Sequence, residues 1–239
     1  MTVTDRSAPA SEIGRGPLSR WSATVYWALV IELLILLTSL PGLLALFLLD
    51  RSVSDVPLAA LCLVPLGPAL GAATYAWRAY LVATPDQRDL APASRFWRGY
   101  RLSWRDVLAW WVPTLVVLAL LAVNVLHAGA VVGQVWAIAS LVVAVALLVW
   151  AGNALVLSAL FAFRTRDVVR LAAYYLAARP VAALGNLTLV VLGATLAIVT
   201  TDRLLLALAT LAIASLTRTA TPVIADVTTR FTSPHPADC

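Results

Sequence analysis

Residues 23–49 read ATVYWALVIELLILLTSLPGLLALFLL, and this stretch decides the fold class. Glu32 is its only charged residue. A helix that crosses a bilayer needs roughly 20 apolar residues, and this stretch is longer than that. Because a water-facing fold cannot bury so long an apolar run easily, we predict a transmembrane helix from about Trp21 to Leu49.

The composition extends this prediction to most of the chain. Of its 239 residues, 62% are hydrophobic and 12% are charged, and the mean hydropathy is +0.90. Soluble domains are about half apolar and about a quarter charged. We therefore predict an all-α, polytopic transmembrane bundle of six spans over residues 20–230, with a disordered cytoplasmic tail at 1–19 and a second cytoplasmic tail at 231–239. The five further spans are expected at about residues 56–81, 107–126, 131–163, 181–199 and 204–216.

The arginines orient this bundle. All 17 basic residues are arginine. On the six-span arrangement, only Arg51 and Arg203 fall on one side of the membrane, and the other arginines fall on the opposite side. Cytoplasmic loops carry the excess of basic residues, so both termini are expected in the cytoplasm. Arginine-only usage with abundant Ala, Leu and Val is typical of a high-GC bacterium, which predicts a multi-pass protein of the bacterial plasma membrane. The net charge of +5 then reflects arginines that set the orientation of membrane insertion and contact anionic lipid headgroups, rather than a surface that binds nucleic acid.

The second predicted span carries helix-bending and helix-packing signals. Pro65 and Pro68 each lack a backbone donor and should bend the helix. Gly67 and Gly71 are separated by three residues, a spacing that lets a second helix approach closely in lipid. Packing is the favoured interpretation of this pair.

The segment SRFWRGYRLSWR at residues 94–105 is the most patterned part of the chain. At about 100° per residue, its basic and aromatic side chains fall on nearly opposite faces of a helix. We expect this helix to lie in the membrane interface, with its rings in lipid and its guanidinium groups at the phosphates. An anchor on the lipid headgroups is the favoured interpretation, and a docking surface for a cytoplasmic partner is the alternative. The two sets are Arg95, Arg98, Arg101 and Arg105, and Phe96, Trp97, Tyr100 and Trp104. A shorter basic helix is expected at residues 167–178.

Glu32 is expected near the middle of the bilayer, because it lies about ten residues into the first span at 1.5 Å per residue. A carboxylate at that depth is costly unless it is paired, protonated or facing water. Arg218, which interrupts the sixth span, is the expected partner, and Arg78 is the alternative. The pair would either hold two helices together or take part in moving a proton or solute.

The remaining polar signals do not predict chemistry. Asn124 and Asn153 fall at membrane level, as do Gln134 and Asn186, and hydrogen bonding between helices is the expected role of such amides. The histidines and cysteines are too far apart in the sequence to predict a metal site. No phosphate-binding loop, nucleophile elbow or carboxylate pair is present, so we expect no catalytic residues, no cofactor and no enzymatic activity.

Several short motifs resemble the YesL-like family of bacterial membrane proteins, whose function is unknown. They are SLP at residues 39–41, GAATY at 71–75, FWRGYR at 96–101 and AFR at 162–164. The resemblance covers about residues 20–230. It implies an accessory role in carbohydrate uptake, because genes of this family often stand beside sugar transporters and glycan-degrading enzymes, and it assigns no catalytic residue.

Two functional hypotheses follow. The first is a non-catalytic integral membrane protein that assists carbohydrate uptake, with an ABC transporter as its membrane partner and the basic loops as docking surfaces. The alternative is a small transporter or channel whose pathway includes Glu32. A membrane enzyme acting on lipid or glycan ranks below both.

Overall fold

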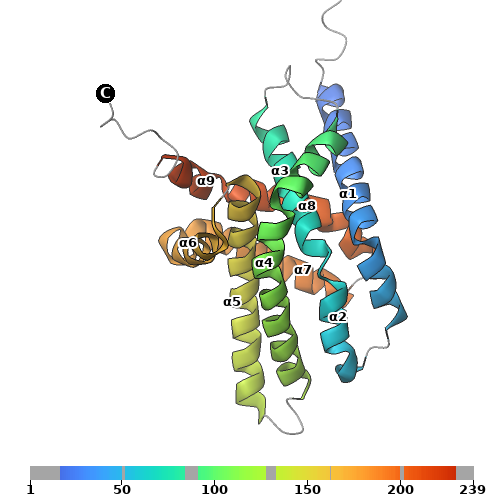
Figure 1. Cartoon of the computed structure of the whole chain (residues 1–239), viewed down its shortest axis with the longest axis vertical. Helices are drawn as coiled ribbons and strands as arrows, with labels where there is room; N and C mark the ends of the chain where they lie inside the picture. The colour runs from blue at the N-terminus through green and yellow to red at the C-terminus, as the bar shows by residue number, and fades with distance from the viewer. Residues whose placement is uncertain are drawn as a thin grey trace, which may run out of the picture.

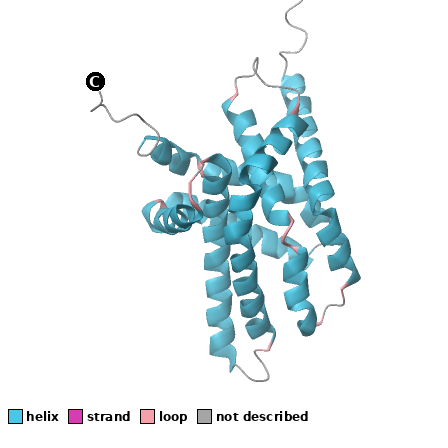
Figure 2. Ribbon diagram, viewed as in Figure 1, coloured by secondary structure: helices cyan, strands magenta, loops and turns pink. Residues whose placement is uncertain are grey.

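The computed structural model describes residues 17–49, 52–83, 91–127, 133–161, 163–199 and 202–229. Within these ranges the chain forms helices that are joined by short loops, and it contains no strand (Figure 2). The all-α prediction is therefore confirmed. Helix α1 begins at Pro17, inside the segment expected as the first tail. The rest of that tail and the whole second tail lie outside the described residues.

The longer helices of the N-terminal part run along the long axis of the molecule in Figure 1. They are α1 (Pro17–Leu48), α3 (Leu66–Val82), α4 (Pro92–Leu126) and α5 (Gly133–Leu160). A 3-10 turn, η1 (Val53–Asp55), and the short helix α2 (Val56–Cys62) connect α1 to α3. Helix α3 contacts α1, α4 and α5, so it lies at the centre of this group.

The bend predicted in the second span is confirmed. Helices α2 and α3 meet at 43° across a break at residues 63–65. Pro65 lies in the break and Pro68 follows it in the first turn of α3, and neither can donate a backbone hydrogen bond. The carbonyl of Leu63 in the break accepts the backbone N–H of Leu66 at 3.2 Å and also the indole Nε1–H of Trp111 on α4 at 3.2 Å.

The C-terminal part is arranged differently. It contains α6 (Thr165–Ala178), α7 (Pro180–Val199), α8 (Asp202–Thr219) and α9 (Thr221–Val227). The expected basic helix is α6, which ends just before Pro180 and meets α7 at 101°. Helices α7 and α8 lie behind the upright helices in Figure 1, and α8 runs across α1 and α3 towards α9.

The described residues do not clearly supply the six spans that were expected. By length and composition, α1, α4 and α5 can each cross a membrane, and the described residues supply up to five spans if each bent helix pair counts as one. Two features account for the difference. The chain turns sharply between α6 and α7, and α8 carries three charged residues, Asp202, Arg203 and Arg218. The helix content is that of a multi-pass membrane protein with three to five candidate spans.

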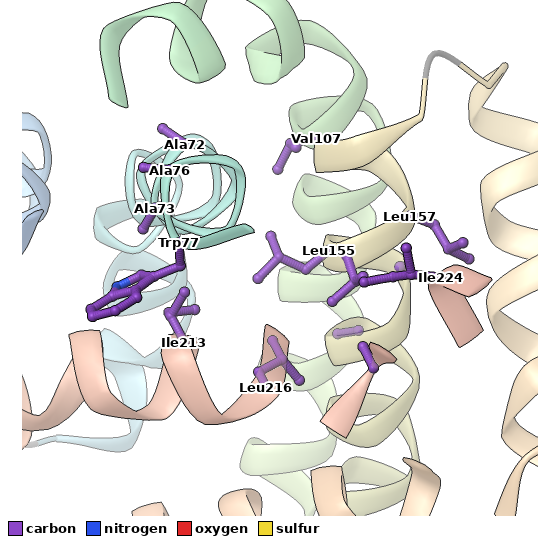
Figure 3. Close-up of a cluster of buried hydrophobic side chains, with 14 of the residues drawn as sticks. Ala72, Ala73, Ala76, Trp77, Val107, Leu155, Leu157, Ile213, Leu216 and Ile224 are labelled. Atoms are coloured by element: carbon purple, nitrogen blue, oxygen red, sulfur yellow. The ribbon is translucent and has the colours of Figure 1, made fainter. Parts of the chain in front are cut away.

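Small residues on α3 let its neighbours approach closely. Ala72, Ala73 and Ala76 are fully buried, and Figure 3 shows them within a cluster to which α4, α5 and α8 also contribute side chains. A Cβ added at Gly67 would lie 2.4 Å from Cδ1 of Trp111, so only a glycine fits there. The close approach predicted for the glycines of the second span is therefore confirmed.

This contact predicts that Gly67→Ala is destabilising although alanine is the better helix former. The added methyl group must displace the Trp111 indole, and overpacking of this kind costs about 1 to 3 kcal/mol. Gly193→Ala on α7 is the matched control, because a Cβ added at Gly193 meets no heavy atom within 4 Å. It should be neutral or stabilise by up to about 1 kcal/mol. Equilibrium unfolding in mixed micelles measures both changes, and equal effects of the two substitutions would contradict the packing account.

Candidate functional site

Helix α4 positions the basic aromatic segment. It starts with Pro92 in its first turn and continues for 35 residues to Leu126. At 1.5 Å per residue it is about 52 Å long, whereas the apolar core of a bilayer is roughly 30 Å thick. Residues 94–105 are therefore the first turns of one continuous helix that also contains the third predicted span, and their orientation in the interface stays a prediction. No helix-breaking residue interrupts the chain between Pro92 and Pro113 apart from Gly99, which packs against Tyr75.

The aromatic face of this segment packs partly on protein. Phe96 is 0% exposed and belongs to the buried core, and Tyr100 is half-buried beside it with a ring separation of 6.4 Å. Trp97 and Trp104 keep 39% of their surface exposed. The prediction that all four rings enter lipid is therefore wrong for Phe96.

The opposite face presents the arginines. Arg98, Arg101 and Arg105 are exposed, and none of the three forms an ion pair with an acidic residue of the described ranges. The guanidinium group of Arg105 lies 4.9 Å from the ring centre of Trp104. Arg95 is half-buried and already interacts within the protein. We call the three exposed residues, Arg98, Arg101 and Arg105, the arginine face, and its chemistry suits carboxylate or phosphate groups.

Glu32 joins α1 to α8. Its Oε2 accepts a hydrogen bond from the backbone N–H of Thr210 at 2.9 Å and a second, shorter one from the Thr210 hydroxyl group. Its other oxygen, Oε1, is buried and has no hydrogen-bond donor among the described residues. The carboxylate therefore acts as a link between two helices and retains one free acceptor.

The expected partners of Glu32 lie elsewhere. Arg218 is exposed near the end of α8, two turns beyond Thr210, and Arg78 is half-buried on α3. Within the described part of the chain neither forms an ion pair with Glu32. Because α8 runs across the bundle, it brings Thr210 to α1 and carries Arg218 out to the surface. Sequence reasoning missed Thr210, whose only signal is a hydroxyl group inside an apolar stretch.

Two of the membrane-level amides meet. Asn153 on α5 and Asn186 on α7 are 2% and 3% exposed, and Asn186 Nδ2 donates to Asn153 Oδ1 at 2.9 Å. This is the kind of hydrogen bond between helices that the sequence analysis expected. Asn124 is exposed near the end of α4 and is not brought to either of them.

A third polar contact was missed from the sequence. Asp226 on α9 accepts hydrogen bonds from the Tyr175 hydroxyl group at 2.8 Å and from Arg179 Nη2 at 2.9 Å. Asp226 therefore links α9 to the end of α6 through these two hydrogen bonds. The sequence signal for this contact would have been an acidic residue, Asp226, on one short helix and a basic residue, Arg179, at the end of another. No three His, Cys, Asp or Glu residues of the described ranges gather closely enough to hold a metal ion.

Comparison with known proteins gives one family. Residues 23–125 match the profile of a family described as a protein of unknown function, DUF624. The matched region runs from α1 almost to the end of α4, and it includes Glu32 and the arginine face. No curated protein and no solved structure matches the chain. The match attaches no function to the chain, and the YesL-like name stays a prediction.

The Glu32 contact predicts a selective response to substitution. Thr210→Val removes one donor to the carboxylate and should lower the free energy of unfolding by about 0.6 kcal/mol, the average for hydrogen bonds between membrane helices, and by no more than about 1.7 kcal/mol. Thr210→Ser keeps the hydroxyl group and should be milder. Arg218→Gln should have no effect, because Arg218 is exposed.

A double-mutant cycle identifies the partner in the same unfolding assay. In a Glu32→Leu background, Thr210→Val should lose most of its effect, because the acceptor is already gone. The opposite result would be that Arg218→Gln lowers the free energy of unfolding as much as Thr210→Val is expected to, and that this loss disappears in the Glu32→Leu background. Glu32 would then be paired with Arg218 instead.

Proposed function

We propose that this chain is a non-catalytic membrane protein that assists a larger membrane assembly by docking through its arginine face. The observation that carries the proposal is the exposure of Arg98, Arg101 and Arg105 on the first turns of α4, whose other face packs partly on protein. On the six-span arrangement, the abundance of arginine on one side of the membrane supports a location in a bacterial plasma membrane with both termini in the cytoplasm.

Docking is favoured over anchoring because of where the aromatic rings lie. An interfacial anchor gains its affinity by burying an apolar face in lipid. Here Phe96 packs inside the protein, and Gly99 lies against Tyr75, so much of that face is already covered. The segment is held in place by α3, which leaves its arginines available for an acidic surface on another protein.

The resemblance to the YesL-like family supports a sugar ABC transporter as the partner. Such a partner would present carboxylate groups on the cytoplasmic surface of its permease or ATPase subunit. Opposite charges across the rim of an interface speed association and select the partner more than they add to affinity.

A transporter or channel is the second candidate, favoured by the free Oε1 of Glu32. Three cavities among the residues that the structure describes are lined by other side chains, and the carboxylate already bonds to Thr210. The helix-linking role is therefore the better supported one. If Glu32 does lie in a pathway, Glu32→Gln abolishes solute flux in proteoliposomes while the folded fraction stays unchanged.

Purification of the tagged chain from membranes tests the docking proposal. The triple variant Arg98→Gln, Arg101→Gln, Arg105→Gln should recover about tenfold less of the sugar permease or its ATPase, corresponding to about 1.4 kcal/mol. A control variant, Arg164→Gln, Arg166→Gln, Arg218→Gln, removes three other exposed arginines and should recover the normal amount. Equal recovery with both variants, at equal membrane insertion, would contradict docking through this face.

A further inference from the structure

A groove runs along one flank of α6, and we call it the α6 groove. Its volume is about 400 Å³. It is lined by one residue of the preceding loop and four of α6, which are Phe163, Asp167, Arg170, Leu171 and Tyr174. The four helical positions are three or four residues apart, so they share one face of α6. The neighbouring face is buried in the protein core through Val168 and Ala172, which fixes the groove on the surface.

The α6 groove presents one acidic and one basic side chain next to each other. Asp167 and Arg170 are both exposed, and within the described ranges neither forms an ion pair. Residues at this spacing have Cβ atoms about 5 to 6 Å apart on a helix. Both charged groups are therefore accessible to a ligand that carries a negative and a positive group a short distance apart.

The side chains of the groove define the chemistry of such a ligand. A guanidinium group such as that of Arg170 binds phosphate through paired hydrogen bonds. A carboxylate attracts an ammonium group, and so does the face of an aromatic ring, which Tyr174 supplies at 54% exposure. A cavity of about 150 Å³ holds benzene, so the α6 groove has room for a group more than twice as large. Phosphate and ammonium joined by two carbons, as in phosphoethanolamine, match these contacts and this volume.

The α6 groove lies at the level of the membrane interface. Helix α6 lies across the side of α5 in Figure 1, and the indole Nε1 of Trp150 on α5 donates to the carbonyl of Val169 at 3.2 Å. The ring of Trp150 also contacts Trp110 on α4, with ring centres 5.8 Å apart. From these two tryptophans to Leu126 and Gly133, the helices extend about 25 Å, close to the roughly 30 Å of an apolar bilayer core. Tryptophan is enriched at this boundary, so α6 is placed among lipid headgroups.

We propose that the α6 groove binds the headgroup of phosphatidylethanolamine, a phospholipid with a primary amine. Arg170 donates hydrogen bonds to its phosphate, and its ammonium group donates to Asp167 and lies against the Tyr174 ring. Phe163 and Leu171 contact the glycerol end. The site is separate from the arginine face and does not depend on the docking proposal. An anionic headgroup without an amine would place its phosphate beside Asp167, and such a like-charge contact is unfavourable.

Native mass spectrometry of the full chain in detergent tests the proposal. The chain is titrated with dioctanoyl phosphatidylethanolamine in a constant excess of dioctanoyl phosphatidylglycerol, and the two lipids are distinguished by mass. The anionic lipid occupies surfaces that attract any phosphate, including the arginine face. We expect saturable retention of phosphatidylethanolamine despite this excess, because only the α6 groove also binds its amine.

Three substitutions at exposed positions of α6 locate the site. Arg170→Gln and Asp167→Asn should each weaken retention of phosphatidylethanolamine about tenfold, the loss expected for one hydrogen bond to a charged group. Arg166→Gln is the matched control, because Arg166 is exposed on the same helix but does not line the groove, and it should retain the lipid normally. Equal retention by all three variants, or no retention by the unsubstituted chain in the presence of phosphatidylglycerol, would overturn the proposal.

Free phosphoethanolamine distinguishes a lipid from a soluble phosphate ester. It has the same headgroup chemistry but lacks the chains that hold a lipid in the micelle. It should therefore displace phosphatidylethanolamine only at concentrations more than about tenfold higher than those of the lipid, since each buried CH₂ group contributes about 0.8 kcal/mol. Displacement at equal concentration would show that the groove takes a soluble ligand and would overturn the lipid assignment.

Discussion

The close contact between α3 and α4 is the constraint on which the rest of the structure depends. Helices in lipid gain little from the hydrophobic effect, so they associate through packing and hydrogen bonds. Gly67 lies under the Trp111 indole and Gly99 lies against Tyr75, so neither position has room for a side chain. With α4 held in this register, Trp111 reaches the carbonyl of Leu63, and the arginine face is left pointing away from α3. The surface proposed for docking is thus a consequence of the packing beneath it.

Polar contacts then join the C-terminal helices to this core. Glu32 bonds to Thr210 on α8, and Asn153 bonds to Asn186 on α7. Both pairs link elements that are far apart in the sequence, and both lie among apolar side chains, where a hydrogen bond is stronger and a missing partner costs more. Each pair leaves a buried polar atom without a partner among the described residues. The two hydrogen bonds therefore hold the C-terminal helices against the core.

The sequence predicted the features that depend on local chemistry. Pro65 and Pro68 indicated the bend, and Gly67 and Gly71 indicated the close approach. It did not predict features decided by long-range packing. An aromatic face has the same pattern whether it packs on lipid or on protein, so Phe96 was placed in lipid. A charge in an apolar stretch is a stronger sequence signal than a hydroxyl group, so the sequence indicated Arg218 and gave no indication of Thr210. The course of α7 and α8 across the bundle has no signal in hydrophobic periodicity.

The account depends most directly on α8 meeting α1 at Thr210, and chemical cross-linking measures this. In a chain whose native cysteines are replaced, Glu32→Cys is combined with Thr210→Cys or with Arg218→Cys and treated with a short bifunctional thiol reagent. Thr210 and Arg218 are about 12 Å apart along the helix, well beyond the span of such a reagent. The account predicts rapid cross-linking of the pair at residues 32 and 210 and none of the pair at residues 32 and 218. The opposite result would contradict the crossing arrangement and restore an upright final helix with a Glu32–Arg218 pair.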